Sequence, residues 1–117
     1  MYWDNINEQE KRIQKVIQNL KTESDIQDAW LSHTQHVVAF PFKAKVVESQ
    51  EPDSIIQEGD VLNVHMLDFI DDKYGIIANS RLSRKKILIP LCELDAVALN
   101  EEGKNAIMDY ATWFANR

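Results

Sequence analysis

The most chemically distinctive stretch of the sequence runs from Glu48 to Asp72, where eight carboxylate side chains occur without a single lysine or arginine. Carboxylates at this density repel one another unless water or cations neutralise them. Carboxylate oxygens are also the ligands that a hard cation such as Ca²⁺ prefers, and it takes about six to eight of them. The stretch therefore predicts a Ca²⁺-binding surface, and a solvated acidic surface that aids solubility is the alternative.

Two segments of this stretch are predicted to supply the metal ligands. One ends in an acidic loop closed by Gly75, which permits a sharp turn, and the other is a long polar loop stiffened by Pro52. The predicted principal ligands are Glu51, Asp53, Asp68, Asp71 and Asp72. A second site or an outer shell is predicted at Glu58, Asp60, Glu93 and Asp95.

The spacing of these acids differs from that of an EF-hand. Counted from Asp68, the third, sixth and twelfth positions are Ile70, Lys73 and Asn79. An EF-hand needs an acid, a glycine and a glutamate at those positions. The Ca²⁺ prediction therefore depends on the density of acids in the region and not on a known loop motif.

Other reactive side chains give weaker hypotheses. A zinc site of His33, His36 and Cys92 lacks an obvious fourth ligand, so two ordinary loop histidines are the better interpretation. Cys92 has no histidine nearby in the sequence that would activate it as a nucleophile. Paired acids such as Asp71 and Asp72, in a loop expected to be solvated, suit metal binding better than proton transfer. We therefore expect a binding protein and not an enzyme.

Composition narrows the class of protein further. The net charge of −6 argues against a nucleic-acid or anionic-membrane partner and permits metal ions or a basic protein partner. No apolar run approaches membrane-spanning length, and residues 1–11 are too polar for a signal peptide. The single Cys92 excludes an intramolecular disulfide, which favours a reducing, cytoplasmic setting.

The elements that must position the acids follow from hydrophobic periodicity. Helices are expected at residues 5–20, at 24–32 with Ser24 as N-cap, and at 100–114 with Asn100 as N-cap. Strands are expected at residues 37–47, 61–69, 75–82 and 87–91. His33 to His36 are expected in a loop, and Trp3, Trp30 and Trp113 are expected to pack the helices onto the sheet.

This order predicts an α+β fold, a small SH3-like antiparallel β-barrel with N-terminal helices and a C-terminal helix. We expect a single domain over residues 1–117, divided into a helical N-terminal extension (1–36), the β-barrel (37–98) and the C-terminal helix (99–117). In such a barrel the long loop and the acidic loop lie together at one end, and they would share one ion there.

Four segments carry a resemblance to a known family: residues 40–46 (FPFKAKV), 75–77 (GII), 89–94 (IPLCEL) and 109–113 (DYATW). In this order and spacing they resemble the small cyanobacterial calcium-binding proteins of the CcbP type over about residues 30–114. The resemblance implies a cytoplasmic protein without EF-hands that buffers or senses free Ca²⁺. It also implies a link to heterocyst differentiation in filamentous cyanobacteria.

A different class of function stays open on the same residues. An SH3-like protein–protein interaction module would use the acidic face to meet a basic partner, and an exposed aromatic groove would bind its peptide. Ca²⁺ titration separates the two classes, because only a metal-binding protein changes its melting temperature, Trp fluorescence or amide NMR shifts with the ion.

Overall fold

In the computed structural model, the backbone is described for residues 2–117 and the side chains for residues 8–117. The side chain of Trp3 lies outside the described residues. Three α-helices and five β-strands follow one another, with one short 3₁₀ helix. They are α1 (Tyr2–Ile17), α2 (Glu23–Val37), β1 (Phe42–Val46), β2 (Val61–Asp71), β3 (Gly75–Leu82), β4 (Lys85–Pro90), η1 (Leu91–Glu93), β5 (Leu94–Ala96) and α3 (Glu101–Asn116).

Helix α2 begins one residue earlier and ends five residues later than the sequence predicted. Its N-cap is Thr22, whose Oγ1 accepts a hydrogen bond of 3.1 Å from the N–H of Asp25, so Ser24 as N-cap was wrong. Trp30 and Thr34, one turn apart, are both fully buried, and this apolar face keeps the chain helical to Val37. His33 and His36 are therefore helical and do not form an exit loop.

Helix α3 has the predicted N-cap. The Asn100 side chain accepts a hydrogen bond of 2.8 Å from the N–H of Gly103. Buried Ile107 and Tyr110 face the rest of the protein from this helix, at the three-residue spacing of one helical face.

The five strands form one antiparallel sheet in the order β4-β3-β2-β1-β5. Strand β3 has the predicted bounds, whereas β2 continues two residues beyond Phe69 because Ile70 and Asp71 still pair with Ile76 and Gly75. Strand β1 is shorter than predicted, because α2 continues to Val37 and residues 38–41 form the connection between the two elements. The α+β architecture and the antiparallel strands are thus confirmed.

The sheet does not close, so the SH3-like barrel is not confirmed. Strands β4 and β5 are the two edges of the sheet. Strand β4 ends at Pro90, which has no N–H to continue a ladder, and η1 then turns the chain away. Strand β5 has only three residues, and they pair with β1. An edge strand this short cannot reach β4.

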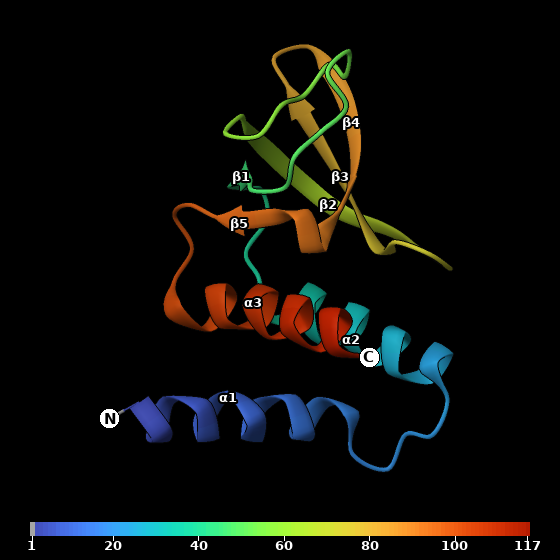
Figure 1. Cartoon of the computed structure of the whole chain (residues 1–117), viewed down its shortest axis with the longest axis vertical. Coiled ribbons are helices and arrows are strands. Elements are labelled where there is room, and N and C mark those ends of the chain that lie inside the picture. Colours follow the sequence, from blue (N-terminus) through green and yellow to red (C-terminus); the bar gives the residue numbers. More distant parts are fainter. Residues whose placement is uncertain (1) are drawn as a thin grey trace.

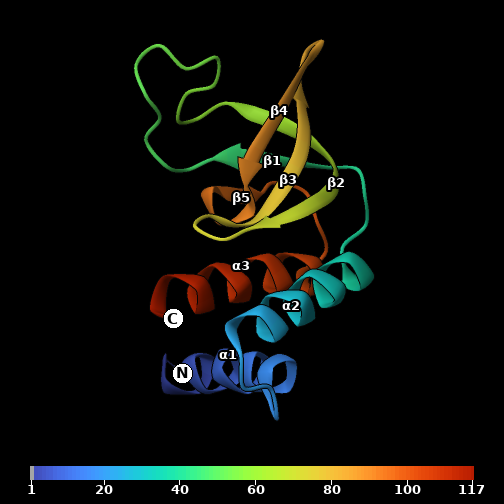
Figure 2. The same cartoon turned by 90° about the vertical axis from the view of Figure 1, so that its right-hand side faces the viewer.

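The molecule is layered (Figures 1 and 2). The sheet lies over α2 and α3, and α1 packs on the opposite side of these two helices. Trp30 of α2 packs against α3, with its ring centroid 5.8 Å from Tyr110 and 6.2 Å from Trp113. Burying aromatic rings of this size between helices and sheet stabilises the arrangement. Trp30 belongs to the core that the helices share with the sheet, and Trp113 is partly buried against that core.

The long loop between β1 and β2, residues 47–60, is anchored at its base. The N–H of Gly59 donates to the carbonyl of Val46 and the N–H of Val46 donates to the carbonyl of Asp60, both at 2.8 Å. Figure 1 shows that the loop lies on the side of the sheet away from the helices, whereas the β2–β3 turn lies beside the beginning of α2.

Candidate metal centre

The β2–β3 turn, residues 72–74, is organised by the carboxylate of Asp71. Its Oδ2 accepts hydrogen bonds of 2.8 Å from the backbone N–H groups of both Lys73 and Tyr74. This is the local bonding by which Asp residues stabilise tight turns. Asp71 is therefore fixed in place, and the lone pairs of its Oδ1 can still coordinate a cation.

A groove of about 360 Å³ separates this turn from the first half of α2. Four carboxylate side chains from two segments far apart in the sequence line it, together with a hydroxyl and an amide. The residues that line this metal groove are Glu23, Ser24, Gln27, Asp28, Ile70, Asp71 and Asp72. The first turn of α2 adds the partial positive charge of its N–H groups, which helps the helix to carry Glu23.

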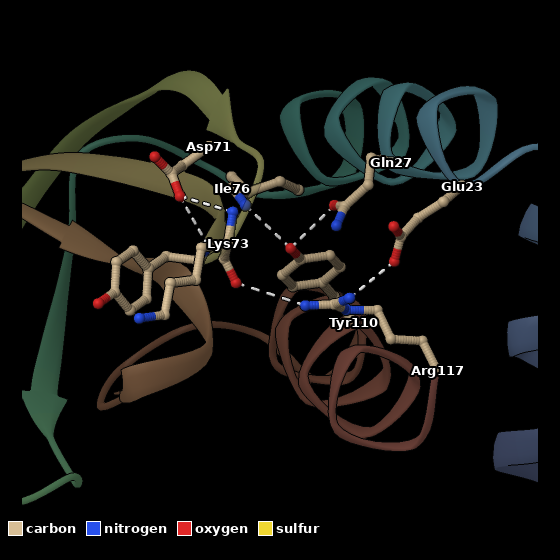
Figure 3. Close-up of polar contacts among 8 residues, drawn as sticks. Glu23, Gln27, Asp71, Lys73, Ile76, Tyr110 and Arg117 are labelled. Atoms are coloured by element: carbon tan, nitrogen blue, oxygen red, sulfur yellow. Dashed lines mark hydrogen bonds and ion pairs between the residues drawn. The ribbon is translucent and has the colours of Figure 1, made fainter.

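A buried tyrosine fixes the distance between the two walls of the metal groove (Figure 3). The hydroxyl of Tyr110 accepts a hydrogen bond of 2.9 Å from the N–H of Ile76 and donates one of 3.0 Å to Oε1 of Gln27. Burial raises the pKa of Tyr110 to about 12, so the hydroxyl keeps its proton at neutral pH. The β-hairpin and α2 are therefore joined through α3.

Gly75 makes this junction possible. Its φ of 74° is left-handed, and a Cβ there would clash with the Tyr110 hydroxyl and lie 2.6 Å from the Phe114 ring. The glycine that the sequence assigned to a sharp turn thus has a second role, because its missing side chain admits α3 against the hairpin.

Arg117 lies at the rim of the metal groove (Figure 3). One guanidinium nitrogen is 2.8 Å from Oε1 of Glu23, and another donates to the carbonyl of Lys73 at 3.4 Å. The guanidinium carbon lies 4.0 Å from the centre of the Phe114 ring. A cationic group therefore already links an acid of α2 to the β2–β3 turn.

The structure distributes the principal predicted ligands over several places. Asp71 and Asp72 line the metal groove, whereas Asp68 is exposed on β2 and accepts a hydrogen bond of 3.2 Å from Asn79. Glu51 lines a different groove, and Asp53 is exposed in the long loop. Within residues 8–117, no three Asp, Glu, His or Cys side chains are already gathered as a metal-binding group.

The predicted outer-shell acids have local partners or face solvent. Asp60 accepts a hydrogen bond of 2.9 Å from the N–H of Gln57, and Glu93 accepts one of 2.9 Å from the side chain of Gln50. Glu58 is exposed in the long loop, and Asp95 is exposed on β5. Sequence reasoning missed Glu23 and Asp28, because no local signal connects the start of α2 to a turn more than forty residues away.

A larger cavity of about 820 Å³ lies between the three helices. Lys15, His33 and His36 line it, and Arg12 holds the buried carboxylate of Asp109 through contacts of 2.7 and 3.1 Å. The bond to Asp109 raises the pKa of Arg12. Glu101 and Glu102 also line this cavity. A Ca²⁺ ion would nevertheless meet Arg12 and Lys15 beside them, and the buried carboxylate of Asp109 is already neutralised.

Cys92 does not join the two histidines of that cavity. It lies in η1, where burial, and then the neighbouring charge of Glu93, raise the pKa of the thiol. A protonated thiol is a poor zinc ligand and a poor nucleophile. The zinc hypothesis gains no support from this arrangement.

Comparison with known proteins decides the family. The sequence model of a family described as calcium binding, of the CcbP type, matches residues 10–114. The chain belongs to the CcbP family. No curated protein matches the chain.

Solved structures share the fold of this CcbP-family chain. The crystal structure of CcbP from Anabaena superposes with a TM-score of 0.76 at 18% identity, covering 93% of this chain and 90% of the other. A calcium-binding protein in its calcium-binding form gives a TM-score of 0.75, also at 18% identity, over 92% and 90% of the two chains. In the part of the chain that the structure describes, none of the helices has the length and apolar character needed to cross a membrane.

Proposed function

We propose that the chain binds Ca²⁺ in the metal groove between α2 and the β2–β3 turn, with Asp71 and Asp72 on one wall and Glu23 and Asp28 on the other. The observation that carries the proposal is that four carboxylates from these two segments line one groove. Membership of a calcium-binding family supports it. Four negative charges with two neutral oxygen groups suit a hard divalent cation.

The groove requires small movements before one ion can contact several acids. The carboxylates are not yet gathered around a common point, and Glu23 is bound to Arg117. Ca²⁺ accepts irregular coordination at 2.3–2.6 Å from flexible ligands, whereas Mg²⁺ needs a near-octahedral cage and keeps its waters. The arrangement therefore favours Ca²⁺ over Mg²⁺ at equal concentration.

A protein of this kind would buffer or sense free Ca²⁺ in the cytoplasm. An ion that binds Glu23 would release it from Arg117, so the contacts at the rim of the groove would differ between the ion-free and ion-bound states, which supports sensing. The single cysteine supports a reducing compartment. The role in heterocyst differentiation is an expectation that depends on the family resemblance alone.

The test is a calorimetric Ca²⁺ titration of charge-matched double variants, each of which removes two negative charges. We expect Asp71→Asn/Asp72→Asn to lose Ca²⁺ affinity by at least tenfold, since each substitution removes a negative charge and one of two carboxylate oxygens from a proposed ligand. The control is Glu8→Gln/Glu10→Gln on the exposed face of α1, which we expect to bind as the wild type does. Equal losses in both would show a diffuse electrostatic effect, which added salt would also weaken.

Two further double variants decide whether α2 or the long loop supplies the ligands opposite Asp71 and Asp72. If the proposed groove is the site, Glu23→Gln/Asp28→Asn should lose Ca²⁺ affinity and Glu51→Gln/Asp53→Asn should not. The reverse result would support the sequence prediction, in which the long loop closes the site, and would overturn the α2 wall. Failure of the wild type to bind Ca²⁺, or equal binding of Mg²⁺, would contradict the function itself.

A further inference from the structure

A second groove, of about 730 Å³, runs between the long loop of residues 47–60 and strands β2, β3 and β4. Five consecutive residues of β4, Lys86 to Pro90, line it, and β4 is an edge of the sheet. None of the residues that line the metal groove lines this one. We call this second groove the docking groove. What it binds does not depend on whether the proposed calcium site is correct.

Large apolar side chains are concentrated in the docking groove and are incompletely buried. Phe69, Tyr74 and Leu88 are 46%, 48% and 49% exposed, and Ile55 from the loop is 61% exposed. Exposed apolar side chains that gather in one concave place mark an interaction surface, whereas single scattered ones do not. Two of the four are aromatic, the residue class that is enriched in the cores of protein interfaces.

Among the described residues, the charged side chains that line the docking groove are two acids, Glu51 and Glu93, and one base, Lys86. The loop of residues 47–60 contains five acids and no base, and its Glu51 lines the groove. Glu93 lines the groove as well, with its Oε1 held at 2.9 Å by the side chain of Gln50. An apolar floor beside an acidic loop complements a ligand that is both apolar and positively charged.

We propose that the docking groove binds an extended segment of a partner protein in which Lys or Arg residues alternate with aromatic or aliphatic residues. Alternation places the apolar side chains on Phe69, Tyr74 and Leu88 and the basic ones against the acidic loop. The groove follows an edge strand, and extended peptides commonly bind along such edges or in aromatic-lined grooves. A hard cation would find mostly carbon on this floor, and the acidic loop repels an anionic ligand.

The direct test measures the fluorescence anisotropy of short labelled peptides with the full chain. The probe alternates Lys with Tyr and Leu, and the control peptide has Glu in place of every Lys. We expect the basic peptide to bind at least tenfold more tightly than the acidic one, with an affinity that falls as salt is added. Binding of neither peptide, or equal binding of both, would overturn the proposal.

Matched variants locate the binding. Leu88→Ser and Phe69→Ser each remove a half-exposed apolar contact, and we expect about a fivefold or larger loss of peptide affinity. The control is Met66→Ser, which removes a side chain that is 49% exposed on β2 and lies outside the docking groove. Similar losses in all three would place the peptide elsewhere.

The acids of the docking groove and the identity of its occupant are tested separately. Glu51→Gln/Glu93→Gln should weaken binding of the basic peptide and make its affinity less dependent on salt. Glu8→Gln/Glu10→Gln should change neither the affinity nor its salt dependence. Thermal unfolding of each variant checks that the fold is kept. Sedimentation that showed a dimer of the wild type, lost in Leu88→Ser, would identify a second copy of the chain as the occupant and overturn the partner proposed here.

Discussion

The metal groove and the long loop are both acidic, yet they differ in what lies opposite their acids. At the metal groove, Asp71 and Asp72 line one wall and Glu23 and Asp28 of α2 line the other, so the space has carboxylates on both sides. At the long loop, Glu51 lies beside Phe69, Tyr74 and Leu88, so carboxylates border an apolar surface. The first arrangement suits a small cation, and the second suits a large ligand with basic and apolar groups.

The two regions also differ in how their backbone is held. The β2–β3 turn is fixed to α2 and α3 through the Tyr110 hydroxyl and through Arg117. The long loop is held mainly by its own residues, for example by the side chain of Gln57, which donates to the carbonyls of Glu51 and Ser54. Two acidic regions therefore differ in chemistry, because tertiary contacts decide which groups their acids face.

The largest expected effect is on the free energy of unfolding, and it separates two glycines that both have positive φ. Gly75→Ala should destabilise the protein by about 3 kcal/mol or more, since a left-handed backbone and a clash with Tyr110 and Phe114 add together. Gly59→Ala in the long loop, where nothing lies within 4 Å of an added Cβ, should cost only about 1–2 kcal/mol. Urea unfolding measures both. Equal losses would mean that α3 does not approach the turn closely.

The next effect comes from Tyr110→Phe, which should cost about 1–3 kcal/mol at neutral pH by leaving the Ile76 N–H and Gln27 unpaired. Burial raises the pKa of Tyr110 from 10 to about 12, so the folded state keeps a proton that the unfolded chain loses. The contribution of Tyr110 to the stability of the wild type is complete below pH 10. It falls by about 2 kcal/mol as the pH rises toward 12.

The difference between Tyr110→Phe and the wild type should therefore shrink above pH 10 in unfolding experiments. Tyr74→Phe is the control, since it removes a hydroxyl from a half-exposed side chain that takes no part in the Ile76 and Gln27 hydrogen bonds. A difference that stays constant up to pH 12 would contradict a buried, neutral Tyr110.

The smallest expected effect concerns Arg117. Arg117→Gln releases Glu23 and should raise Ca²⁺ affinity by about two- to fivefold, the size expected for a partly exposed ion pair of up to about 1 kcal/mol. Arg84→Gln in the exposed β3–β4 turn changes the net charge equally and should have less effect. Calorimetry compares the two. Lower affinity in Arg117→Gln would show instead that the pair positions Glu23 for the ion.

Much of the secondary structure could be read from local chemistry. Strand β3 and the N-cap at Asn100 have the predicted positions, because alternation and capping are properties of neighbouring residues. The errors have tertiary causes. Helix α2 continues through His33 and His36 because Thr34 is buried against the core. The sheet stays open because the three residues of β5 pair with β1 and not with β4.

The sequence by itself determined the density of acids, the sharp turn at Gly75, the family and the kind of ion to expect. Only the tertiary structure brought Glu23 and Asp28 to Asp71 and Asp72, and it left Glu51 beside an apolar groove. The physical reason is that charge density is additive along a chain, whereas coordination depends on where distant segments meet. That meeting is set by the packing of Tyr110 into the space left open at Gly75.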